Sequence, residues 1–107
     1  MTSEATPIPT TEEMTQTIDE AAWDWLRPHL ERDALILVSP DIELVDAGQA
    51  LARDNVPLIQ QYIDAGRLGK PNNAQVGAWD ARRHDQKFLM LIVSPYILIQ
   101  EIPLLIQ

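Results

Sequence analysis

The sequence predicts an α+β domain, or a small α/β domain, in which a two- to three-stranded sheet packs against about four helices. Two observations support this fold class. Three short and almost entirely apolar runs, rich in β-branched residues, are typical of buried strands: 34–38, 88–93 and 96–101. Between these runs, apolar residues recur at three- and four-residue steps beside capping residues, which indicates amphipathic helices.

The length of the chain and the composition of its first residues define the expected domain. A chain of 107 residues suits one hydrophobic core. Residues 1–16 are rich in Thr, Pro and Glu and contain few large apolar side chains, so burial cannot offset the entropy lost on ordering them. We therefore expect a flexible acidic tail at residues 1–16 and a single globular domain at residues 17–107.

Two of the expected helices precede residue 54. The first spans residues 17 to about 30, and Pro28 ends or kinks it. Its apolar stripe consists of Ile18, Ala21, Ala22, Trp25, Leu26 and Leu30. Because Ser39 directly before a proline is typical of an N-cap, we expect the second helix at residues 40 to about 53.

Two further helices are expected between residues 55 and 82. Asn55 can cap a helix at residues 56–65, and Gly66 can supply the left-handed residue that ends it. The turn at residues 71–73 then predicts a cap and a short fourth helix that ends near Arg82. In the strands, we expect Leu37 and Ile92 to be core residues on neighbouring buried strands.

Charge and cysteine content exclude several classes of function. The formal net charge is -8, from 16 acidic and 8 basic residues, which disfavours binding to nucleic acid. The chain has no cysteine, so it has no disulfide, no thiolate nucleophile and no cysteine-based metal site. The N-terminal residues lack the basic and apolar regions of a secretory signal, so we expect a cytoplasmic location.

The apolar stretch at residues 88–106 raises the question of membrane contact. A spanning helix needs about 20 predominantly apolar residues, and here Pro95 and Pro103 would break the helix while Glu101 adds a charge. We therefore expect no transmembrane segment. Three interpretations of the C-terminal part of the stretch remain: domain core, dimer interface or peripheral membrane contact.

The strand at 34–38, the following run at 42–47 and the closing run at 91–101 together resemble a bacterial family of uncharacterised small proteins, domain of unknown function 2288. Trp79 and residues 93–101 match the family pattern best. The chain departs from that pattern at Tyr96, where a Trp is usual, and in its apolar tail beyond residue 101. The resemblance covers about residues 17–101 and implies fold and compartment, but no activity, cofactor or site residue.

Few side chains form patterns typical of catalysis or metal binding. Asp41 and Glu43 diverge on a helix, and only Glu43 and Asp46, at i and i+3, can share a face. A solvated first turn that matches the helix dipole explains them better than a metal site does. The two histidines are far apart in sequence, and Ser39 and Ser94 each precede a proline without a nucleophile-elbow motif. We predict no catalytic, cofactor-binding or metal-ligating residue, and no cofactor.

The sequence therefore favours a small interaction or regulatory domain without catalytic activity. The alternative is a small enzyme or ligand-binding module whose polar cleft would use Asp41, Glu43, Asp46, Arg82 and His84. These two hypotheses differ in a structural expectation. The five side chains converge on one concave pocket if the alternative holds, and otherwise lie scattered over the surface.

The C-terminal segment is the expected contact surface. Large apolar residues continue beyond the central strand, and a small domain has little interior left to cover them. We expect self-association as a homodimer, or binding to a protein partner. The expected interface consists of Tyr96, Ile97, Leu98, Ile99, Ile102, Leu104 and Leu105.

Overall fold

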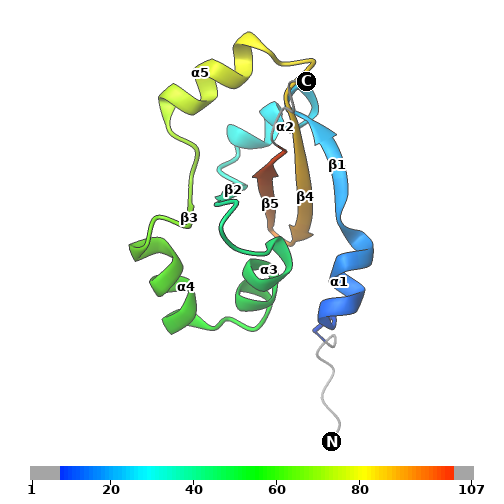
Figure 1. Ribbon diagram of the computed structural model, residues 1–107, viewed down its shortest axis with the longest axis vertical. Coiled ribbons are helices and arrows are strands. Elements are labelled where there is room, and N and C mark those ends of the chain that lie inside the picture. Colours follow the sequence, from blue (N-terminus) through cyan, green and yellow to red (C-terminus); the bar gives the residue numbers. More distant parts are fainter. Residues whose placement is uncertain (1–7, 103–107) are drawn as a thin grey trace, which may run out of the picture.

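The computed structural model describes residues 8–102, which form five helices and five strands (Figure 1). In chain order these are α1 (Thr11–Thr17), β1 (Asp19–Ala22), α2 (Trp23–Leu30), β2 (Leu35–Val38), α3 (Leu44–Ala52), α4 (Val56–Asp64), β3 (Leu68–Gly69), α5 (Asn73–Ala81), β4 (Lys87–Val93) and β5 (Tyr96–Glu101). The mixed α+β class is confirmed. Within the described residues, no helix has the length and apolar character needed to cross a membrane.

The strands form one sheet in the order β1-β4-β5-β2-β3. Only β2 and β5 are parallel, with Leu35 opposite Ile97, and every other neighbouring pair is antiparallel. The three strands expected from the sequence are therefore the central ones. The expected strand count was too low because β1 and β3 add one short strand to each side.

Helices cover both faces of the sheet. Successive side chains of a strand point to opposite faces, so neighbouring residues of β5 pack in different core clusters. Leu98 of β5 packs in one core cluster with residues of α1, α3 and α4. Its neighbours Ile97 and Ile99 pack in a second cluster with residues of α2 and α5. Figure 1 shows α2 and α5 toward one end of the sheet and α3 and α4 toward the other.

Aromatic rings anchor α2 and α5 to the sheet. The ring centroids of Trp23 and Trp79 lie 4.9 Å apart, and those of Trp79 and Phe88 also lie 4.9 Å apart, with the two rings nearly perpendicular at 88°. The Trp23 indole N–H donates to Asp80 Oδ1 at 2.7 Å, and Arg27 Nε donates to the same oxygen at 3.1 Å. The Trp23 hydrogen bond and Arg27 lower the pKa of the Asp80 carboxyl against the opposing effect of burial.

Several local predictions are confirmed. The Asn55 side chain accepts a hydrogen bond from the Leu58 N–H at the start of α4, and Gly66 follows its end with a φ of 75°. Asn72 forms a capping box with Gln75 at the start of α5. The strand at residues 96–101 has the expected bounds. In each case the signal lies within a few residues of the element that it defines.

The N-terminal predictions are wrong. Residues 11–17 form α1 instead of part of a flexible tail: Thr10 and Glu13 make a capping box, and Met14 is 4% exposed in the core. The expected helix at 17–30 is a strand followed by a helix, because residues 19–22 pair with β4. Local helical spacing in the sequence was outweighed by pairing with a strand distant in the chain. Residues 1–7 lie outside the described part of the chain.

Two other predictions need correction. The second helix begins at Leu44 instead of Pro40, because the Ser39 hydroxyl accepts from the Asp41 N–H and forms a turn before the helix. Ile92 is 55% exposed and Leu37 is only partly buried, so neither is a fully buried core residue. Their strands are not neighbours either, since β5 lies between β2 and β4.

Candidate functional site

The expected dimer interface is largely core. Ile97, Leu98 and Ile99 are buried by the chain's own helices, so the prediction that they form a contact surface is wrong. The physical reason is that β5 is a central strand, paired on both edges and covered on both faces. Tyr96 remains exposed and Ile102 is half-buried. Leu104 and Leu105 lie outside the described residues.

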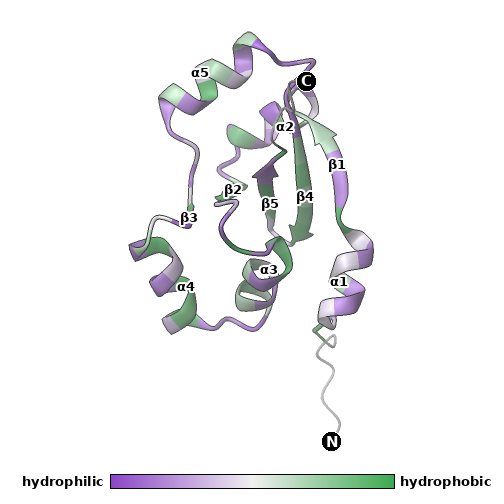
Figure 2. Ribbon diagram, in the orientation of Figure 1, coloured by the Kyte–Doolittle hydropathy of each residue, from purple (hydrophilic) through white to green (hydrophobic). Residues whose placement is uncertain are grey.

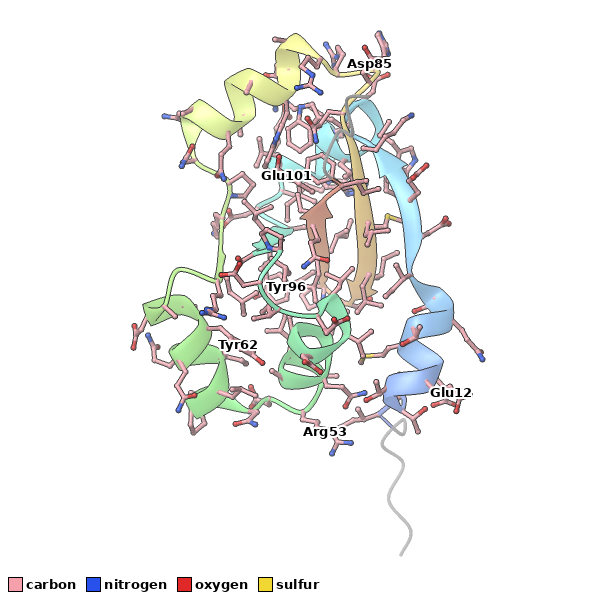
Figure 3. The ribbon with its side chains drawn as sticks, in the orientation of Figure 1. Glu12, Arg53, Tyr62, Asp85, Tyr96 and Glu101 are labelled. Atoms are coloured by element: carbon pink, nitrogen blue, oxygen red, sulfur yellow. The ribbon has the colours of Figure 1, made fainter. Side chains whose placement is uncertain are left out.

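The five polar residues of the enzyme alternative do not converge. Asp41, Glu43 and Asp46 lie at the start of α3, whereas Arg82 and His84 lie between α5 and β4. Asp85 lies in the same connection as Arg82 and His84, and Arg53 follows the end of α3. In Figure 3, Asp85 and Arg53 lie at opposite ends of the molecule. Among residues 8–102, no three His, Cys, Asp or Glu side chains gather closely enough to hold a metal ion.

A polar cleft of about 330 Å³ opens at the carboxyl ends of the parallel strands β2 and β5. Ligands commonly bind at this position in open α/β sheets. The cleft contains two cationic side chains, but each has a carboxylate partner: Arg67 pairs with Asp41 at 4.0 Å and Lys70 pairs with Asp33. These ion pairs reduce the positive charge available to a ligand.

A second feature is the open outer edge at the end of β4. The ladder between β1 and β4 ends at the pair Asp19–Met90, so β1 places no residue opposite Ile92. The Ile97 N–H donates to Ala34 O on the β2 side, so Ile97 does not exchange backbone hydrogen bonds with Ile92 opposite it. The Ile92 N–H and C=O therefore point away from β5, toward the outer edge.

An apolar groove of about 960 Å³ lies along this open edge. One wall is the end of β4, and the other is α1 with the residues before it. The groove is lined by Ile8, Pro9, Glu13, Met14, Thr17, Ala52, Leu91, Ile92, Val93 and Ser94. Figure 2 shows the strongly hydrophobic β4 ending beside the more polar α1. This volume lies toward the upper end of ligand pockets, which occupy about 300–1,000 Å³.

The charges near the groove differ from those at the two outer edges of the sheet. β1 begins with the exposed acidic residues Asp19 and Glu20, and β3 is followed by Lys70 and Pro71. Charged residues and proline are common protection against pairing with another chain. Within residues 8–102, the last residues of β4 have no such protection, and Glu13 is the one charged side chain in the groove lining.

Sequence reasoning could not find this groove. It depends on the β1–β4 ladder stopping three residues before the end of β4, and on the position of α1 beside the uncovered stretch. One local signal was present, since the Thr10–Glu13 spacing is typical of a capping box. That spacing predicts a helix start, but not where the helix packs.

The fold and site define a class: a small mixed sheet with helices on both faces and an apolar groove at an open strand edge. The chain belongs to the family described as Protein of unknown function (DUF2288), whose model matches residues 9–101. The resemblance seen in the sequence is confirmed, and the family match includes α1. A search of curated proteins finds no match.

A solved structure shares this fold. The chain is similar to PA1075 from Pseudomonas aeruginosa, determined in solution by NMR, with a TM-score of 0.75 and 25% sequence identity. The similarity covers 96% of this chain and 95% of that chain. The likeness therefore extends over nearly the whole length of both chains.

Proposed function

We propose that the protein is a small interaction domain that binds an extended apolar segment in the groove between α1 and β4. The segment adds to the sheet as a further strand at the open edge of β4. The observation that carries this proposal is the coincidence of two features: outward-pointing backbone groups at Ile92 and an apolar groove beside them. Strand addition uses such groups for affinity and adjacent pockets for side-chain specificity.

The exposure of Ile92 supports this proposal. The residue is 55% exposed although its neighbours along the strand, Leu91 and Val93, are buried or partly buried. A bound strand would cover Ile92 and would provide partners for its N–H and C=O. Apolar burial contributes about 25 cal/mol per Å² removed from water, so covering this surface favours binding.

The charge of the molecule indicates which segments bind well. The described groove lining is mostly apolar, with Glu13 as its one charged side chain, and the whole chain carries a net charge of -8. An apolar segment with basic residues at its ends would therefore associate faster than one with acidic ends. Such a segment would bury its centre in the groove and leave its charged ends near the acidic surface.

Selection from a library of displayed random heptapeptides tests this function. We expect enrichment of sequences with alternating large apolar residues on the wild-type protein, and loss of that enrichment on Ile92→Lys. Ile63→Lys is the matched control, because Ile63 is 48% exposed on α4 and does not line the groove. Equal enrichment on wild-type and Ile92→Lys protein, or none on either, would contradict the proposal.

A further inference from the structure

Two segments of the chain lie outside the described residues, at positions 1–7 and 103–107. The first is mostly small or polar and contains Glu4. The second contains three consecutive large apolar residues, Leu104, Leu105 and Ile106, and no charge. By composition, the C-terminal segment matches an apolar groove and the N-terminal segment does not.

The C-terminal segment cannot reach the groove of its own chain. The Ile102 N–H donates to Lys87 O at 3.2 Å, so the chain leaves the sheet where β4 begins. Ile92 lies five residues further along β4, or about 17 Å at about 3.3 Å per residue. Ile106 lies four residues beyond Ile102 and reaches at most about 14 Å. Figure 1 shows that β5 ends beside the start of β4, away from α1.

We infer that the occupant of the groove is residues 103–107 of a second copy of this chain, an inference that rests on the proposed function. Pro103 has no N–H to donate, so strand pairing would begin after it. In an extended strand, Leu104 and Ile106 share one side and Leu105 takes the other. Reciprocal exchange of the two segments gives a closed, twofold-symmetric dimer.

The shape of the groove favours a single inserted segment over pairing between two β4 edges. Met14 and Thr17 of α1 form the wall opposite β4. Two copies paired edge to edge would each have to place a whole sheet where α1 stands. A single strand adds only one spacing of about 4.8 Å to the sheet and so needs far less room than a second sheet.

Sedimentation equilibrium at micromolar concentration provides the first test. We expect the full-length protein to be a dimer and both Ile92→Lys and the double variant L104D/L105D to be monomers, with dissociation constants raised at least tenfold. Ile63→Lys should remain a dimer. A monomeric full-length protein, or a dimer that L104D/L105D leaves intact, overturns the inference.

Mixing the two monomeric variants separates segment insertion from edge pairing. L104D/L105D has an intact groove and Ile92→Lys has an intact C-terminal segment, so one insertion remains possible in the mixture. We expect unlabelled Ile92→Lys to shift the NMR signals of Ile92 and Val93 in ¹⁵N-labelled L104D/L105D. No shift overturns the inference. If displayed peptides still bind in an Ile92-dependent way, the proposed function stands alone; if they do not, both are wrong.

Discussion

Replacing Met14 by alanine tests whether α1 forms a wall of the groove. Met14 is the one buried residue of α1, and a seven-residue helix is too short to be stable by itself. Met→Ala changes in cores cost about 2–5 kcal/mol, and we expect about 2–3 kcal/mol because the groove lets water reach the vacated space. For a domain of this size, Tm falls by about 4–8 °C for each kcal/mol.

Urea unfolding followed by tryptophan fluorescence measures this loss, because Trp23 and Trp79 are buried in the folded protein. Gln16→Ala is the control, since Gln16 is exposed on the same helix and its replacement should change stability by less than about 0.5 kcal/mol. If Met14→Ala is as stable as Gln16→Ala, then α1 does not dock on the core and the groove lacks one wall.

Three other predictions concern packing and charge. A Cβ at Gly48 would lie 2.6 Å from Leu91 Cδ2, so Gly48→Ala should destabilise the protein by about 1–3 kcal/mol in urea unfolding. A Cβ at Gly77 on α5 would meet no atom within 4 Å, so Gly77→Ala should raise stability by about 0.5–1 kcal/mol; a destabilised Gly77→Ala would contradict the packing given for α5. Because the pKa of Asp80 is lowered on folding, its carboxylate stabilises the fold above the unfolded-state pKa, and this contribution is lost as the pH falls through the folded-state pKa. Urea unfolding at pH 7 and at acidic pH should therefore show a smaller loss of stability for Asp80→Asn than for the wild type, and equal losses would refute this role of Asp80.

The sequence predicted elements whose signals are local. Asn55 and Asn72 cap their helices through hydrogen bonds to N–H groups three residues ahead, and such spacing is readable without knowledge of the fold. The bounds of β5 followed from its apolar run and the flanking proline. The helix expected over residues 19–22 failed because those residues pair with residues 87–90, a contact that local periodicity does not encode.

The candidate site was less predictable than the fold. An apolar C-terminal segment suggested a contact surface, but the sequence did not separate residues 97–99, which fill the core, from the residues beyond them. The residues on either side of position 100 are similarly apolar in the sequence. Residues 97–99 are buried because β5 lies between β4 and β2 in the sheet, an order that the sequence does not show. The exposure of Ile92 likewise results from where β1 stops, so it depends on the register of two strands far apart in the chain.

Hydrogen exchange at the Ile92 amide tests the central claim, strand addition at the edge of β4, most directly. The measurement uses the L104D/L105D variant, with and without a saturating amount of the most enriched display peptide in synthetic form. We predict that the peptide slows exchange at Ile92 at least tenfold and leaves Leu91, whose N–H faces β5, unchanged. Peptide binding that leaves exchange at Ile92 unaltered would contradict strand addition.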